Sequence, residues 1–125
     1  ILGGILLRND VLALIPHVET DDFRDPRAQF TWAAMRNLEV ARSPIDTITL
    51  PAELERMGKL DAVGADFLGD CAYRVPTPEN VVHYAAELRD LALRDRVRAV
   101  GTSIADAARR DLSGGDLVDH LGAQA

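Results

Sequence analysis

A long stretch without proline limits what the C-terminal half of the chain can fold into. Between Pro78 and Leu112 no further proline occurs, and apolar residues recur at threes and fours, as on one face of an α-helix. The stretch predicts a single helix of about 30 residues and about 45 Å, because each residue adds about 1.5 Å. Gly101 is the one candidate break. Such a helix is longer than a 125-residue globule needs, so part of it is expected to project and to pack against another element.

Shorter signals ahead of this stretch mark the ends of several other helices. The dipeptide Asp25–Pro26 predicts a helix start, because Asp can cap free backbone amides and Pro suits the first turn. The run Thr49–Pro51 repeats this pattern, and Gly58 predicts the end of the helix that follows. Residues 61–73 predict one or two short helices, interrupted near Gly64.

The N-terminus also has helical periodicity. Residues Ile1–Ile15 have apolar side chains at helical spacing and predict one helix, and Pro16 is expected either to end it or to begin a short second helix. Gly3 and Gly4 are expected to let another helix approach closely.

Three aromatic residues have predicted places around the Asp25 cap. Phe23 is expected to pack back on the first turn as a hydrophobic staple. Phe30 begins the apolar row of the following helix, and Trp32 is expected at the edge of that row.

Composition agrees with a helical chain. Hydrophobic residues make up 47% of the sequence and aromatic residues only 5%, so the core must be mainly aliphatic, which favours helices over a β-sandwich. We predict an all-α fold in one domain: a compact helical head over residues 1–76, followed by a long helix and a helical hairpin over residues 77–125. The turn of that hairpin is predicted at Ser113–Gly115.

The charge balance bears on partners. The formal net charge is −6, and an acidic domain repels a phosphate backbone, so we expect little direct DNA binding. No apolar run approaches the roughly 20 residues that span a bilayer, and no membrane association is expected. Cys71 is the only cysteine, which fits a reducing compartment and a cytoplasmic location.

Motifs for catalysis or metal binding are missing from the sequence. There is neither a phosphate-binding P-loop nor a dinucleotide-binding glycine motif. His17, His83 and His120 are too widely spaced for a helical metal site. Asp22 and Asp25 are better explained as helix caps than as cation ligands. We therefore predict no catalytic, cofactor-binding or metal-binding residue in this chain.

Four residues are candidates for an interface. Tyr84 lies on the apolar face of the long helix, where a tyrosine either packs in the core or anchors a partner. Leu117, Val118 and Leu121 form the apolar face of the last predicted helix and have few partners in their own chain. We predict that these four residues mediate self-association or partner binding.

Five ordered segments resemble one known family, the N-terminal domain of replicative DnaB-type DNA helicases. They are ILGGILL (1–7), DDFRDPRAQF (21–30), PIDTITL (44–50), ELERMGKL (53–60) and VPTPENVVHYAAELRDLALRDRV (75–97). The resemblance implies an all-α domain with a globular head and a hairpin. It implies that hairpins pair between subunits, that a hexamer carries them as a trimer of dimers, and that this collar docks the C-terminal domain of primase. Tyr84, Leu117, Val118 and Leu121 fall where those contacts would occur.

The same resemblance puts enzymatic activity elsewhere. In the family, an ATP- and Mg-dependent motor occupies a separate C-terminal domain, so this chain is expected to have no motor activity of its own. The alternatives are the helicase-binding C-terminal domain of a primase, a small all-α protein-interaction domain, a freestanding small enzyme and a helical DNA-binding regulator. The last two lack, respectively, a cluster of titratable groups and a basic recognition helix.

Overall fold

Residues 1–74 and 77–110, together with residues 115, 118 and 122, are described by the computed structural model. Every regular element among them is an α-helix or a 3-10 helix, which confirms the all-α class. Residue contacts divide the chain into an N-terminal unit, Ile1–Arg89, and a C-terminal unit, Asp90–Ala125. The division expected between residues 76 and 77 stays a prediction.

The N-terminal segment is two helices rather than the one predicted. The α-helix α1 (Leu2–Leu7) ends at Arg8, whose backbone is extended, and the 3-10 helix η1 (Asn9–Leu14) follows. The Asn9 side-chain amide donates to the carbonyls of Ile5 and Ile45, each at 2.8 Å, and its oxygen accepts from the Ile45 amide at 2.7 Å. A side chain that binds backbone groups in this way competes with helix continuation, so apolar spacing alone overestimated the helix.

The helix α2 (Pro26–Val40) begins where the sequence predicts, after the 3-10 helix η2 (Thr20–Asp22). The Asp25 carboxylate accepts from the Arg27 amide at 2.9 Å. Trp32, expected at the edge of the apolar row, is instead buried at its centre. Phe23 packs on Trp32 with ring centroids 5.5 Å apart, so this aromatic contact reaches beyond the first turn.

The helix α3 (Thr49–Arg56) is capped by a residue ahead of the predicted start. The Asp46 carboxylate accepts from the amides of Ile48 and Thr49, both at 2.8 Å. These hydrogen bonds lower the pKa of Asp46, with the Thr49 amide as the larger cause. Gly58 follows the helix with a φ of 72°, which confirms it as the predicted stop.

The interruption near Gly64 is confirmed. The helices α4 (Leu60–Val63) and α5 (Ala65–Tyr73) meet at this residue, whose φ of 81° and ψ of 148° are open to glycine and strained for other residues.

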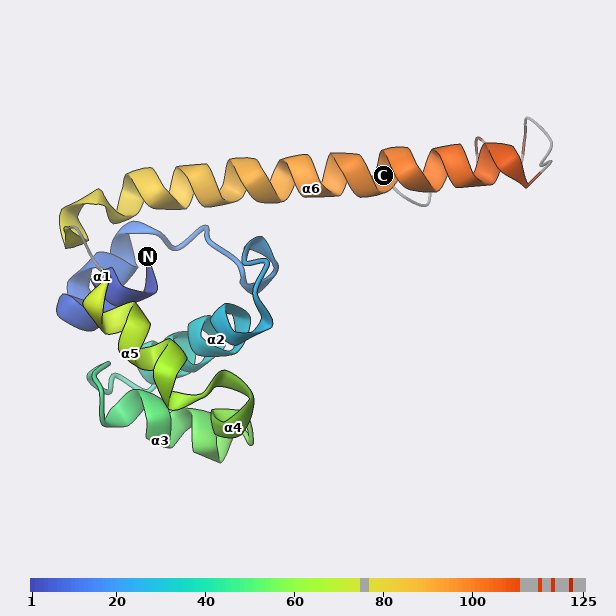
Figure 1. The fold of residues 1–125 in the computed structure, drawn as a ribbon. Coiled ribbons are helices and arrows are strands. Elements are labelled where there is room, and N and C mark those ends of the chain that lie inside the picture. Colours follow the sequence, from blue (N-terminus) through green and yellow to red (C-terminus); the bar gives the residue numbers. More distant parts are fainter. Residues whose placement is uncertain (75–76, 111–114, 116–117, 119–121, 123–125) are drawn as a thin grey trace. The chain divides into compact units, whose positions relative to one another are not determined.

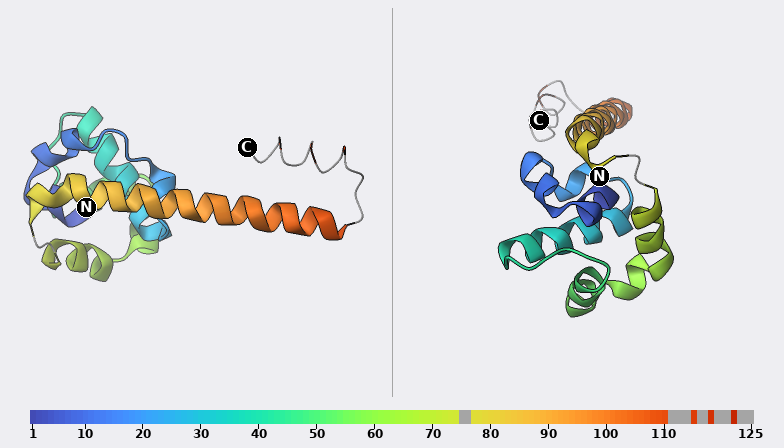
Figure 2. Two further views of the ribbon diagram at one scale, coloured as in Figure 1. Left: turned by 90° about the horizontal axis from the view of Figure 1, so that it is seen from above. Right: turned by 90° about the vertical axis from the view of Figure 1, so that its left-hand side faces the viewer.

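The elements of the N-terminal unit, whose arrangement Figures 1 and 2 show, share one hydrophobic core. Its largest fully buried side chains include Ile5, Leu12, Ile15, Trp32, Met35, Leu50, Leu54 and Val81. The core is mainly aliphatic, as the composition predicts, with Phe23 and Trp32 as its buried aromatic residues.

The long helix is confirmed, with a different first turn. A 3-10 helix, η3 (Pro78–Asn80), precedes the α-helix α6 (Val81–Arg109), which has 29 residues (Figure 1). Helix α6 continues through Gly101 without a break. A Cβ added at Gly4 would meet the Pro78 Cα at 3.6 Å, an ordinary contact, so α1 packs on η3 without strictly requiring glycine there.

Candidate functional site

The first turns of α6 are part of the core of the N-terminal unit. Val81 and Ala85 are buried in that core, and Leu88 packs against it. Tyr84 is half-buried beside them, and its ring centroid lies 5.9 Å from that of His83. Tyr84 therefore stands at the margin of the core, where part of its ring remains open to a partner.

An ion pair between Asp22 and Arg89 holds the same part of α6. The Asp22 carboxylate is buried and accepts from the Glu19 amide at 2.9 Å and from Arg89 Nη1 at 3.3 Å. Arg89 Nη1 also donates to the carbonyl of His17. Asp22 thus acts in a capping box and as the anchor of Arg89, which confirms its expected capping role.

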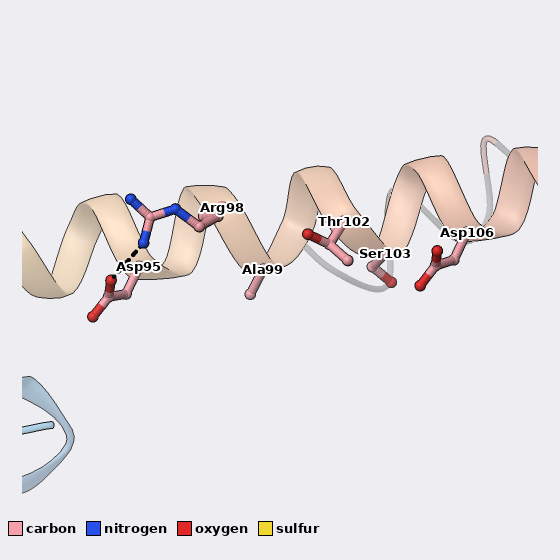
Figure 3. A pocket seen from close by; sticks show the side chains of 6 residues that line it. All are labelled: Asp95, Arg98, Ala99, Thr102, Ser103 and Asp106. Carbon is pink, nitrogen blue, oxygen red and sulfur yellow. Dashed lines mark hydrogen bonds and ion pairs between the residues drawn. The ribbon is translucent and has the colours of Figure 1, made fainter. Parts of the chain in front are cut away.

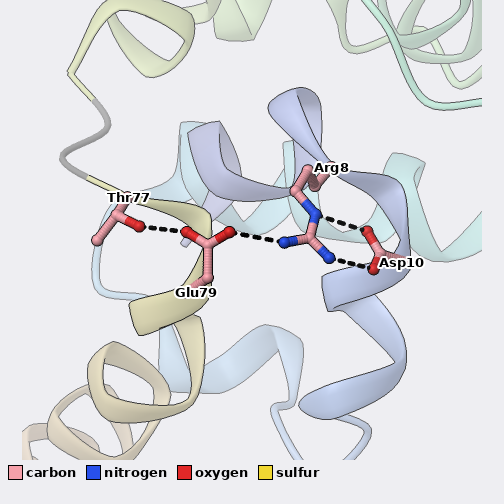
Figure 4. Close-up of polar contacts among 4 residues, drawn as sticks. All are labelled: Arg8, Asp10, Thr77 and Glu79. Atoms are coloured by element: carbon pink, nitrogen blue, oxygen red, sulfur yellow. Dashed lines mark hydrogen bonds and ion pairs between the residues drawn. The ribbon is translucent and has the colours of Figure 1, made fainter.

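A second set of polar contacts holds the residues that directly precede α6 (Figure 4). Arg8 donates to Asp10 and to Glu79, each at 2.6 Å, and the Thr77 hydroxyl donates to Glu79. The Thr77 hydrogen bond is the largest cause that lowers the pKa of Glu79, and the Arg8 guanidinium lowers the pKa of Asp10. These groups are exposed, so the contact positions η3 more than it stabilises the fold.

The C-terminal unit carries an apolar row that we call the α6 stripe: Leu93, Val97, Val100 and Ile104. Their spacings of four, three and four are those of the seam of a coiled coil. Leu93 is 57% exposed, Val97 64% and Ile104 37%. The side chains of a packed seam are buried, so this stripe is an apolar surface available to a partner.

Charged side chains on the same part of α6 are paired along the helix. Arg94 lies 3.0 Å from Asp90, Arg98 3.3 Å from Asp95, and Arg109 3.0 Å from Asp106. Exposed pairs of this kind contribute little stability. They form the solvated border of the stripe, in agreement with the mixed charge pattern of the sequence.

A hollow of about 490 Å³ lies against α6 in the C-terminal unit (Figure 3). It is lined by Asp95, Arg98, Ala99, Thr102, Ser103 and Asp106. The guanidinium of Arg98 is paired with Asp95, as Figure 3 shows. Among the described residues that line it there is no His, Cys or Lys, so these residues offer neither a nucleophile with an adjacent base nor a set of metal ligands.

Of the predicted interface residues on the hairpin, Val118 is described. It is helical and 68% exposed. Leu117 and Leu121 lie outside the described residues, as do Ser113 and Gly114 of the predicted turn. Gly115, the last residue of that predicted turn, is described and is helical.

Among the residues that the structure describes, no three His, Cys, Asp or Glu residues gather as metal ligands would. In the same part of the chain, no helix combines the length and the apolar character needed to cross a bilayer.

Comparison with known proteins places the chain in a family. The model of the DnaB-like helicase N-terminal domain matches residues 1–90. The chain belongs to this family. The predicted resemblance is thereby confirmed, and the alternatives of a primase domain, an unrelated interaction domain, a small enzyme or a DNA-binding regulator are set aside.

Individual relatives agree with the family model. The replicative DNA helicase DnaB of Mycobacterium leprae is 31% identical over 121 residues, which are 95% of this chain and 20% of the relative. That of Leifsonia xyli is 35% identical over 105 residues, 82% of this chain and 23% of the relative. This DnaB-like chain therefore spans about a fifth of the length of the curated relatives that it matches.

The fold has a solved counterpart. The crystal structure of the N-terminal domain of DnaB helicase from Mycobacterium tuberculosis matches with a TM-score of 0.88 at 31% identity, over 98% of this chain and 88% of that one. The likeness confirms the predicted fold of a helical head with a long helix.

The helical spacing of Val97, Val100 and Ile104 in the sequence predicts burial as readily as an interface. Their spacing contained the signal of a seam, but only the exposed fractions distinguish an open seam from a covered one.

Proposed function

We propose that this chain is the collar domain of a replicative DNA helicase, and that it assembles subunits through the α6 stripe. The observation that carries the proposal is an exposed row of Leu93, Val97 and Ile104 at coiled-coil spacing. The relatives are replicative DNA helicases of which this domain is about a fifth. The ATP- and Mg-dependent motor therefore belongs to the remaining part of the parent protein, which we propose acts in the cytoplasm.

Two copies of the stripe can cover each other. Packing the same surface of both copies around a two-fold axis buries four side chains from each. Burying each half-exposed side chain contributes about 1 kcal/mol, so the eight side chains together contribute about 8 kcal/mol. This gain is of the same size as the cost of association, about 4–15 kcal/mol. The isolated domain should therefore form a weak dimer. Tethering in a hexamer, as a trimer of dimers, raises the effective concentration and favours the same contact.

Primase docking is the second part of the proposal. Tyr84 at the margin of the core and Val118 with its 68% exposed side chain are the described candidates for this contact. Leu117 and Leu121 join them from the sequence pattern. The net charge of −6 suits binding to a protein partner better than binding to DNA.

Sedimentation velocity over a concentration series tests the self-association. Val97→Asp and Ile104→Asp place charges in the seam and should weaken the dimer at least about tenfold, since burying an unpaired charge is costly. Thr102→Asp adds the same charge at an exposed position of α6 outside the stripe and should leave the dimer unchanged. A wild-type chain that stays monomeric, or equal effects of all three variants, would refute the stripe as the interface.

Calorimetric titration with a primase C-terminal domain tests the docking. Tyr84→Ala and Val118→Asp should reduce its affinity, while Thr102→Asp should not. Unchanged affinity in both interface variants would remove these residues from the docking surface. Absence of binding to the wild-type chain, at concentrations where it dimerises, would refute primase docking while leaving the assembly role intact.

A further inference from the structure

A separate apolar surface lies on the N-terminal unit, between three short helices. We call it the α1–α3–α5 groove; it is lined by Leu6 of α1, Leu50 and Pro51 of α3, and Leu68, Gly69 and Ala72 of α5. Its volume is about 230 Å³, below the range of about 300–1,000 Å³ that is usual for small-molecule sites. The groove thus has the size for a few aliphatic side chains rather than for a cofactor.

The groove is open along α5. A Cβ added at Gly69 would meet no atom within 4 Å. Leu6 and Leu68 remain half-buried on its two sides, whereas Leu50 beneath them is fully buried. Half-buried leucines on opposite walls form a ready surface for further apolar side chains.

Large exposed apolar side chains are sequence neighbours of the lining residues. Ile48 directly follows the lining residue Thr47 and is 78% exposed, and Tyr73 directly follows Ala72 and is 92% exposed. Leu7, next to the lining residue Leu6, is exposed as well. Together with the groove they extend the apolar surface over all three helices, and an exposed Tyr is a frequent interface anchor.

The charged side chains of the two helices α3 and α5 are mainly acidic, although the exposed Arg74 directly follows α5. Helices α3 and α5 contain four carboxylates and a single guanidinium, that of Arg56, which is paired with Glu53. Asp66 follows the lining residue Ala65 by one position, and Glu55 follows Pro51 by one helical turn, so both lie next to lining residues along their helices. Both side chains are exposed. On the α1 side, the nearby Arg8 is engaged by Asp10 and Glu79 (Figure 4).

We propose that the α1–α3–α5 groove docks a basic amphipathic helix of a partner protein. Apolar side chains of that helix, spaced at three and four residues, would enter the groove, as in other helix-in-groove complexes. Lys or Arg on the flanks of the helix would face Asp66 and Glu55, which sets its orientation and speeds its association. The groove shares no residue with the α6 stripe, so the proposal for the groove can be tested independently of self-association.

The probes are two fluorescein-labelled peptides of about 18 residues, long enough to form helix. Both have Leu along one face; the flanks are Lys in the basic peptide and Glu in the acidic peptide. Fluorescence anisotropy measures their binding to the 125-residue chain. The blocking variant is Gly69→Leu, which fills the groove, and its matched control is Gly69→Ala. Asp66→Lys reverses one flanking charge.

The basic peptide should bind the wild-type chain at least about tenfold more tightly than the acidic peptide. Gly69→Leu should weaken this binding at least about tenfold, Gly69→Ala should leave it unchanged, and Asp66→Lys should weaken it and reduce its salt dependence. Equal binding of the two peptides, no binding of the basic peptide, or equal binding to wild type and Gly69→Leu would overturn the proposal.

Two further measurements keep the test decisive. Amide chemical-shift mapping on the wild-type chain should place the basic peptide on Gly69 and Ala72; shifts confined to α6 would overturn the proposal whether or not Gly69→Leu folds. Sedimentation of Gly69→Leu should show the wild-type dimer. A dimer lost in this variant and kept in Gly69→Ala would show that a second copy occupies the groove, which would replace the partner helix.

Discussion

The N-terminal unit and the C-terminal part of α6 differ in how far their apolar residues are buried. In the N-terminal unit Trp32, Met35 and Leu54 are fully buried, and short helices surround them on all sides. On α6 after Asp90, Leu93 and Val97 keep more than half of their surface exposed. The difference teaches that the first unit supplies its own core, whereas the amphipathic helix leaves an apolar surface exposed, which we propose a neighbour covers.

The largest expected effect contrasts the two regions directly. Leu54→Ala removes a fully buried side chain and should lower the free energy of unfolding by about 2–5 kcal/mol, because it leaves a cavity. Val97→Ala, at an exposed position, should change the free energy of unfolding of the monomer by less than about 1 kcal/mol. Urea unfolding followed by Trp32 fluorescence measures both. Equal losses in dilute protein would mean that the stripe is covered within its own chain.

The next effect compares two ion pairs. Asp22→Ala removes a buried acceptor of the Glu19 amide and of Arg89, and should cost about 1–3 kcal/mol of unfolding free energy. Arg98→Ala breaks the exposed pair with Asp95 on α6 and should cost less than about 1 kcal/mol. Thermal unfolding at low protein concentration measures the two. A cost for Arg98→Ala that matches that of Asp22→Ala would contradict the contrast.

Two glycines should respond to alanine with opposite signs. Gly64→Ala, at a φ of 81° and ψ of 148°, should cost about 1–3 kcal/mol because the backbone is strained for a side chain. Gly101→Ala, inside α6 with open space at its Cβ, should raise helix stability by about 0.5–1 kcal/mol. Circular dichroism during thermal unfolding reports both. A destabilising Gly101→Ala would show that a neighbour packs closely there.

The smallest expected effect is a pH dependence of the N-terminal unit. The Thr49 and Ile48 amides hold the pKa of Asp46 below its ordinary value of 3.8. A lowered folded-state pKa stabilises the fold above the unfolded-state pKa, and this contribution disappears as the pH falls through the folded-state value. The free energy of unfolding should therefore decline from about pH 4 downward.

Asp46→Asn is the variant that checks this pH dependence. It should reduce the slope of unfolding free energy against pH in acid, because Asn does not titrate there. Thr102→Asn on α6 serves as its control and should leave the slope as in wild type. An unchanged slope in Asp46→Asn would show that the cap carries no share of the acid sensitivity.

Local chemistry explains which features were predictable from sequence. Asp25 before Pro26, Gly58 and Gly64 each act through their own backbone conformation or nearest amides, so their roles follow from residue type and position. The predicted N-terminal helix was wrong at Arg8, because the interruption depends on Asn9 binding Ile45, a residue distant in the sequence. Trp32 was misplaced for a related reason: its burial requires other elements to close over it.

The candidate surfaces show the same limit. The spacing of Val97, Val100 and Ile104 predicts an apolar face, and Tyr84 was identified on the opening turns of the same helix. The α1–α3–α5 groove had no sequence signal, since Leu6, Leu50 and Leu68 come from separate helices and read as core residues in each.

The sequence by itself determined the helical class and the main helix stops, because caps, glycines and periodicity act over a few residues. Five ordered segments indicated the family by resemblance. Tertiary structure alone decided which apolar residues are covered. Burial depends on what packs above a side chain: Val81 and Val97 lie on the same helix, yet the core covers the first and leaves the second open.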